Sequence, residues 1–437
     1  MRKSWIIVLA VCMLFGLAGC GPRQEAPPTT QNVTVTEALP EPAETTAGAE
    51  TEPAAETEPV VVTEPVTVQE PEPIAEYMDT GVWMTLDGAD IAWQLAEENY
   101  ERPVSVGEAQ VLTVESETPF FALYIKWNRL PGKFTLKWDG GSLECGTEDF
   151  LHDYIRLPEG VTALTFVFEE ERTRYISLMR AYSEGMAPEG VQDWQSPCET
   201  ADILAFPTHA DDDVLFFGAV LSYYATEKEL SVQTAFMTDH YYEPVRNHER
   251  LDGLWALGIR HYPILGTARD YYTMDLREAA NYHAFDGILE WQVQLIRRFK
   301  PLVILGHDPD GEYGHGQHKL NTYYLMQAVE QAADARQYPW VALQYGLWNT
   351  PKVYLHLYEE NGIVFDVNTV LEKDPAGRTP FEIAKDAYLW HVSQQQYYFA
   401  VSQDPNSVMD CTRFGLYRTL VGYDTGNDLM EHTTRDE

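Results

Sequence analysis

The stretch "ILAFPTHADDDVLFFGAVL", residues 203–221, joins a short apolar run to a helical pattern through a polar loop. The run "ILAF" is continuous and short, as expected of a strand that is buried on both faces. A helix is predicted to begin at about Asp213, after a histidine and two further aspartates. Strand, polar loop and helix in this order form the repeating unit of a parallel sheet.

The same order recurs further along the chain. "VQTAFMT" (232–238) precedes a helical pattern in "RNHERLDGLWALG" (246–258), and "LVILGH" (302–307) precedes one in "GQHKLNTYYLMQAVEQAA" (316–333). We therefore predict an α/β domain over residues 198–437, with a Rossmann-like, mostly parallel sheet and helices on both faces.

A different pattern precedes this domain. "FALYIKW" (121–127) and "KFTLKWDG" (133–140) alternate apolar and polar residues at period two, and proline or glycine separates the runs. We predict a small antiparallel β-sandwich over residues 77–186. Its tryptophans and tyrosines suit a carbohydrate-binding module, and a packing or spacer domain fits the same pattern equally well.

The amino terminus, "MRKSWIIVLAVCMLFGLAGC" (1–20), has two basic residues, an apolar stretch too short to span a bilayer, and a run of small residues. It is predicted to be a signal peptide. Leu17–Cys20 resembles the lipobox of bacterial lipoproteins, which implies lipidation of Cys20 and a place on the extracytoplasmic face of a bacterial cell membrane. A plain secretory signal is the alternative, and both export the chain.

Residues 21–76 are dominated by proline, threonine, alanine and glutamate, with almost no aromatic or basic residues. Such a segment cannot bury enough apolar surface to order itself, so we predict a disordered tether. Cys145, Cys198 and Cys411 stand at no metal-ligand spacing, and one disulfide among them remains open.

The amino-acid composition and net charge indicate which classes of molecule the protein can bind. Hydrophobic residues make up 45% of the chain, which is enough for sizeable cores. The formal net charge is −38, from 68 acidic and 30 basic residues. Because binding to a phosphate backbone needs the opposite charge, nucleic acid is not an expected partner.

Two strand-end loops carry the residues with catalytic potential. Thr208–Asp213 follows the first strand, and "GHDPDGEYGHGQH" (306–318) follows a later one. Ligands of open α/β sheets bind at the carboxyl ends of strands, which is where both loops lie. His209 with Asp212, and His315 with His318, are three residues apart and therefore face the same side of a helical turn.

Two imidazoles and one carboxylate are the ligand set of an open catalytic zinc site, which leaves a fourth position to water. Asp211 is placed to deprotonate that water, and His315 to stabilise an oxyanion or protonate an amine. The set also suits Fe²⁺. The competing interpretation is an aspartate run that only caps a helix, together with solvated histidines.

The segments "PTHADDDVLFFGAVL" and "GHDPDGEYGHGQH" resemble the two signature segments of the PIG-L or LmbE-like N-acetylglucosaminyl deacetylases, over about residues 200–420. The resemblance implies three zinc ligands: His209, Asp212 and His318. It also implies that Asp211 is the general base, that His315 is the general acid or oxyanion stabiliser, and that Arg246 contacts substrate.

Some positions depart from the family pattern. Ala210 and Gly316 replace prolines, and Asp213 replaces a glutamate. Gln317 stands where the family has an aspartate that tunes the catalytic histidine. Because glutamine carries no negative charge, we expect His315 to be less basic in this chain.

The sequence thus predicts a zinc-dependent hydrolase that removes an N-acetyl group from an amino sugar or glycan outside the cytoplasm. An alternative is a cell-surface glycan-binding lipoprotein with a catalytically weakened deacetylase-like domain. A third reading keeps the enzyme and changes the acyl group.

Overall fold

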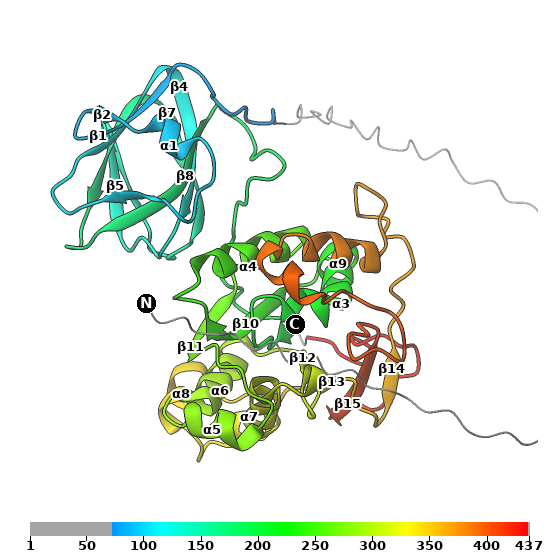
Figure 1. The fold of residues 1–437 in the computed structure, drawn as a ribbon. Helices are drawn as coiled ribbons and strands as arrows, with labels where there is room; N and C mark the ends of the chain where they lie inside the picture. The colour runs from blue at the N-terminus through cyan, green and yellow to red at the C-terminus, as the bar shows by residue number, and fades with distance from the viewer. Residues whose placement is uncertain (1–71, 436–437) are drawn as a thin grey trace, which may run out of the picture. The chain divides into compact units, whose positions relative to one another are not determined.

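The computed structural model describes residues 72–435 (Figure 1). The predicted signal peptide, Cys20 and all but the last few residues of the predicted tether lie outside the described residues. Among residues 72–435, no helix combines the length and the apolar character needed to cross a bilayer.

The carboxyl-terminal part holds a seven-stranded sheet in the order β11-β10-β9-β12-β13-β15-β14. The strands are β9 (Ile203–Ala205), β10 (Val232–Asp239), β11 (Ile264–Arg269), β12 (Val303–Gly306), β13 (Lys352–His356), β14 (Gly362–Val364) and β15 (Arg413–Thr419). The first five strands in this order pair in parallel, and β15 pairs antiparallel with both β13 and β14. The predicted mostly parallel sheet is confirmed.

The strand order reverses at β9. The chain goes from β9 to β10 on one side, whereas β12 pairs with β9 on the other side. The loops that follow β9 and β12 therefore leave neighbouring strands at the same edge of the sheet. This is the topological switch point at which open α/β sheets bind ligands.

Helices lie on both faces of this sheet (Figure 1). One group packs together on one face: α5 (Leu276–Tyr282), α6 (Ile288–Phe299), α7 (Gly316–Ala332) and α8 (Pro339–Tyr345). The second group covers the other face: α2 (Asp212–Leu215), α3 (Gly218–Ser222), α4 (Pro244–Ala256) and α9 (Pro380–Tyr388). The helix predicted near Asp213 begins at Asp212 and breaks after Leu215, so that α2 and α3 are two short helices.

The amino-terminal part is an eight-stranded sheet in which every pairing is antiparallel, as predicted. The elements are β1 (Val82–Leu86), β2 (Ala89–Asp90), α1 (Ala92–Leu95), β3 (Val104–Val106), β4 (Leu112–Trp127), β5 (Phe134–Trp138), β6 (Gly141–Cys145), β7 (His152–Phe168) and β8 (Arg174–Tyr182). The strands form one continuous sheet because the long β4 and β7 each pair along two segments, separated by an irregular register. We call this part the β-domain.

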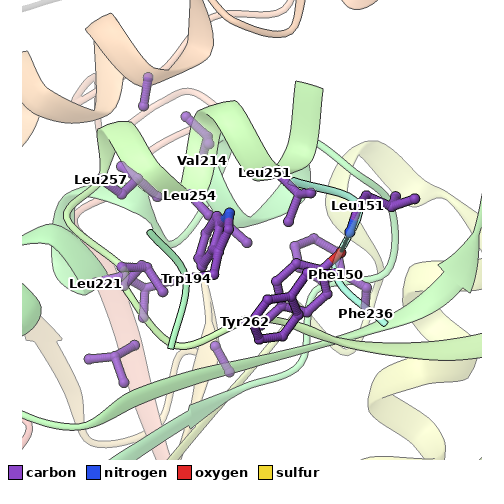
Figure 2. Packing of buried hydrophobic residues seen from close by; sticks show 14 of the residues in the cluster. Phe150, Leu151, Trp194, Val214, Leu221, Phe236, Leu251, Leu254, Leu257 and Tyr262 are labelled. Atoms are coloured by element: carbon purple, nitrogen blue, oxygen red, sulfur yellow. Dashed lines mark hydrogen bonds between the residues drawn. The ribbon is translucent and has the colours of Figure 1, made fainter. Parts of the chain in front are cut away.

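The β-domain packs directly against the α/β part (Figure 2). The rings of Phe150 and Tyr262 stack with their centroids 4.4 Å apart, and the Leu151 N–H donates to the Tyr262 hydroxyl at 2.9 Å. Leu251 and Leu254 of α4 belong to the same buried cluster. Helix α4 therefore contributes to the packing between the two parts.

The three cysteines of the described residues are free and buried: Cys145, Cys198 and Cys411.

Candidate metal-dependent active site

The loops after β9 and β12 bring three predicted ligands together. His209 Nδ1 lies 2.9 Å from His318 Nε2 and 3.3 Å from Asp212 Oδ2, and His318 Nε2 lies 3.1 Å from the same carboxylate oxygen. His209 and Asp212 come from the loop and first turn after β9, and His318 comes from the first turn of α7. All three side chains are buried.

These residues fit a divalent metal. Two imidazole nitrogens and one carboxylate oxygen converge on one point, which is the donor chemistry of a zinc or iron(II) site. The backbone N–H groups of Thr208 and His209 donate to Asp212 Oδ2 at 3.1 and 2.6 Å, which fixes the orientation of that carboxylate. Two overlapping groups could supply ligands: His209, His315 and His318, and Asp212, His307 and His318.

His315 lies beside these ligands. Its ring centroid is 4.9 Å from those of both His209 and His318, and 5.3 Å from that of Tyr272. Burial, together with the neighbouring imidazoles, lowers the pKa of His315 to about 2. Among the described residues, its buried Nδ1 has no hydrogen-bond partner, so this nitrogen is free to bond to a ligand.

Asp211 is held by an arginine. Its Oδ1 accepts a hydrogen bond from Arg246 Nη2 at 3.0 Å, while Arg246 Nη1 donates to Asp270 Oδ2 at 2.9 Å. Burial raises the pKa of Asp211 to about 6, and the Arg246 charge opposes that rise. Arg246, predicted to contact substrate, is thus a buried residue that orients the predicted base.

Gln317 contacts His209, whereas we expected it to act on His315. Its Oε1 accepts from His209 Nε2 at 3.0 Å and from the Tyr271 N–H at 2.8 Å. Because a carboxamide oxygen only accepts hydrogen bonds, His209 must carry its proton on Nε2. Nδ1 then keeps its lone pair for a metal.

The orientation of the Gln317 amide is itself fixed. Its Nε2 donates to the Arg269 carbonyl and to His283 Nε2, both at 2.8 Å. His283 Nδ1 donates to Asp286 at 2.7 Å, which leaves His283 Nε2 as the acceptor that Gln317 needs. No local sequence pattern places His283 here, because it lies far along the chain from both loops.

A second buried group lies behind Asp212. The Glu312 carboxylate accepts from His307 Nδ1 at 3.1 Å and from His356 Nδ1 at 2.9 Å, and His356 Nε2 donates to the Asp410 carbonyl at 2.7 Å. Both nitrogens of His356 therefore contact oxygen atoms inside the protein. Although burial opposes it, the two histidines hold the pKa of Glu312 at about 2.

His307 connects this group to the metal ligands. Its Nε2 accepts from the Thr208 N–H at 3.0 Å and lies 3.4 Å from Asp212 Oδ2. His307 and Glu312 lie in the predicted loop 306–318, but the sequence predicted no role for either. His356 was not predicted, although a histidine at the end of the next parallel strand, β13, was the available signal.

Part of the chain is similar to known deacetylases. A profile of the family described as PIG-L, GlcNAc-PI de-N-acetylase, matches residues 204–329. The 1D-myo-inositol 2-acetamido-2-deoxy-alpha-D-glucopyranoside deacetylase 1 of Catenulispora acidiphila is 27% identical over 228 residues, which are 46% of this chain and 69% of that protein. The enzyme of the same description from Rhodococcus erythropolis is 24% identical over 204 residues, 41% of this chain and 68% of that one.

A solved structure of N,N'-diacetylchitobiose deacetylase from Pyrococcus horikoshii is 18% identical, with a TM-score of 0.34, over 46% of this chain and 74% of that one. The matched segment 204–329 holds most of β9 and α7 and every side chain that converges on the candidate metal position. Residues 204–329 of this chain are therefore similar to the PIG-L family of de-N-acetylases.

Proposed function

We propose that this protein is a metal-dependent de-N-acetylase that hydrolyses the N-acetyl group of an amino sugar within a glycan, outside the cytoplasm. The observation that carries the proposal is the convergence of His209 Nδ1, Asp212 Oδ2 and His318 Nε2 beside the Asp211 carboxylate, in a segment of the PIG-L family. Zinc is the metal we propose, since it would polarise the amide carbonyl and make water more acidic.

Asp211 acts as the general base. It takes a proton from the attacking water as the oxygen bonds to the acetyl carbon, and Arg246 holds its carboxylate in place. When the carbon–nitrogen bond breaks, the nitrogen takes up the proton that Asp211 removed from the water, so the products are acetate and the free amine. His315 hydrogen-bonds the carbonyl oxygen as negative charge develops on it.

His315 suits this role because it is buried against two ligand histidines and has a free nitrogen. As a neutral ring it donates a hydrogen bond without first gaining a proton. Donation of a full proton to the amine is the alternative role for the same residue.

The location rests on the amino-terminal sequence. A basic and apolar leader that ends in Leu17–Cys20, followed by a long segment rich in proline and glutamate, supports a lipid anchor and a tether. Replacing Cys20→Ser should move the protein from the membrane fraction to the soluble exported fraction. Retention of the variant in membranes would contradict the anchor.

The function is tested with the metal-reconstituted full chain on a panel of N-acetylated sugars, with released acetate as the readout. His318→Ala should lose bound metal and acetate release together. Asp211→Asn should keep metal while turnover falls by at least about a hundredfold, the usual contribution of a general base. His261→Ala, which lies outside both loops, is the matched control and should change neither quantity.

Full turnover by Asp211→Asn would refute the base assignment. The competing function, a glycan-binding lipoprotein with a weakened active site, predicts glycan binding without acetate release by metal-loaded protein. Release of a different carboxylic acid would keep the enzyme and change the acyl group.

A further inference from the structure

A cavity of about 490 Å³ opens beside the candidate metal site, at the carboxyl ends of β10 and β11. We call it the tyrosine pocket. It is lined by Asp239, His240, Tyr241, Tyr242, Glu243, Thr267, Arg269, Asp270 and Tyr282. Its volume is in the range of cavities that bind small ligands.

Asp270 connects the pocket to the predicted catalytic residues. Its Oδ1 lies 3.5 Å from His209 Nε2, and its Oδ2 accepts from Arg246 at 2.9 Å. A molecule in the tyrosine pocket would therefore sit one side chain away from the metal ligand His209 and from the arginine that holds the base.

The pocket presents aromatic surface that the fold holds in place. Tyr242 is 71% exposed, and Tyr241 and Tyr282 are about half exposed. Tyr282 stacks on Tyr271 with ring centroids 4.0 Å apart and an interplanar angle of 7°, and Tyr241 lies 4.5 Å from the Arg129 guanidinium of the β-domain. Rigid, exposed tyrosine rings provide large contact area at low entropic cost.

Three charged side chains of the pocket have no hydrogen-bond or ion-pair partner among the described residues. Within residues 72–435, no hydrogen bond or ion pair engages the carboxylates of Asp239 and Glu243 or the guanidinium of Arg269, which lies 5.3 Å from the Tyr242 ring centroid. These groups offer both acceptors and donors beside aromatic faces. That combination suits a ring that carries several hydroxyl groups.

The charged side chains of the pocket favour neutral over acidic sugars. Arg246 is shared between Asp211 and Asp270, so the three carboxylates of the pocket, those of Asp239, Glu243 and Asp270, outnumber its positive charges. A phosphate or carboxylate on the ligand would face this excess negative charge, whereas a neutral sugar would not. The formal net charge of −38 also disfavours the binding of acidic ligands.

We propose that the tyrosine pocket binds the sugar next to the one that is deacetylated, and that the substrate is a neutral oligosaccharide chain. This inference rests on the proposed deacetylase function and specifies its substrate class. Stacking on Tyr242 and Tyr282, with hydroxyl contacts to Arg269, then favours chains over single sugars.

The test uses metal-loaded full chain and measures acetate release from N-acetylglucosamine and from its β-1,4-linked tetramer. For Tyr242→Ala and Tyr282→Ala we expect kcat/KM on the tetramer to fall about tenfold, mainly through KM, which corresponds to one lost stacking contact. On the single sugar, kcat/KM should stay within about twofold. Tyr423→Ala, an exposed tyrosine of the C-terminal loop, is the matched control and should behave as wild type on both.

If kcat/KM of the tyrosine variants falls equally on both substrates, or does not fall on the tetramer, the tyrosine pocket does not bind the neighbouring sugar. If wild-type protein releases no acetate from either substrate, the deacetylase function fails. The pocket is then tested by calorimetric binding of the tetramer to Asp211→Asn protein, where Tyr242→Ala should weaken binding about tenfold. A tetramer of alternating N-acetylglucosamine and glucuronate should bind more weakly than the neutral one, and tighter binding would overturn the charge argument.

Discussion

At the scale of single residues, Gln317 shows how one side chain orients a candidate metal ligand. It accepts the Nε2 proton of His209 and is itself oriented by His283 and the Arg269 carbonyl. A carboxylate at this position would be repelled by that carbonyl oxygen, since it has no N–H to donate. The amide of Gln317 therefore fits the hydrogen-bonding groups around it. Gln317 contacts His209, so we expect it to influence the site through His209.

We predict that Gln317→Leu weakens metal affinity tenfold to about a hundredfold, the usual effect of removing the partner that orients a ligand histidine. The measurement is competition for zinc with a chelator of known affinity. Gln327→Leu, whose side chain bonds only locally to the Tyr323 carbonyl on the exposed face of α7, is the control. Equal affinities of Gln317→Leu and wild type would show that Gln317 does not orient His209.

At the scale of elements, the site depends on which strands are neighbours. The β9 and β12 loops meet because β12 pairs with β9, while β10 and β13 flank this pair. The buried group formed by His307, Glu312 and His356 joins the ends of β12 and β13 directly behind Asp212. This group links the ends of β12 and β13 just beyond their last paired residues, Gly306 and Leu355.

We predict that Glu312→Gln lowers the free energy of unfolding by about 3 kcal/mol or more, because it removes the buried negative charge that His307 and His356 both contact. Urea denaturation measures the loss. Glu330→Gln breaks an exposed ion pair with Arg418 and should cost less than about 1 kcal/mol. Similar losses of unfolding free energy for the two variants would contradict a stabilising role of the buried Glu312 carboxylate.

The positions of helices and strands can be predicted from the sequence more accurately than the contacts between them. Apolar runs and helical periodicity predicted β9, β10, β12, α4 and α7, because each pattern is local. The break between α2 and α3 was not predicted. Residues of both short helices are buried on every side, so the apolar pattern there carries no helical period to read.

At the scale of the whole molecule, a buried polar network joins the β-domain to α4. Lys126 Nζ lies 3.3 Å from Asp252 Oδ1, and His152 Nε2 lies 2.8 Å from His248 Nδ1, with Tyr100 stacked on the His248 ring at 3.9 Å. The same helix carries Arg246 toward Asp211. These contacts favour a packing role for the β-domain, which the sequence left open.

This network predicts a pH dependence of stability. Burial raises the pKa of Asp252 to about 6, against an ordinary value of 3.8, and Lys126 opposes the rise. The folded state therefore binds more protons than the unfolded state between these pH values, so stability falls as pH rises from about 4 to 6. The contribution of this group is about 3 kcal/mol, at 1.36 kcal/mol for each pKa unit.

Denaturation of metal-free protein between pH 4 and 7 should show this fall, and Asp252→Asn should reduce its slope. Asp139→Asn, an exposed turn residue, should leave the slope unchanged. An identical slope for Asp252→Asn and wild type would contradict the proton uptake assigned to Asp252.

The sequence by itself determined the local features of this protein: the strands of a parallel sheet, two strand-end loops, and the pairs His209–Asp212 and His315–His318. These features are encoded over a few residues, through periodicity and spacing. Only the tertiary structure decided that Arg246 holds Asp211, that Gln317 serves His209, and that Asp270 borders the tyrosine pocket. Each of these contacts joins segments far apart in the chain, and strand order, which local patterns do not encode, determines which of them meet.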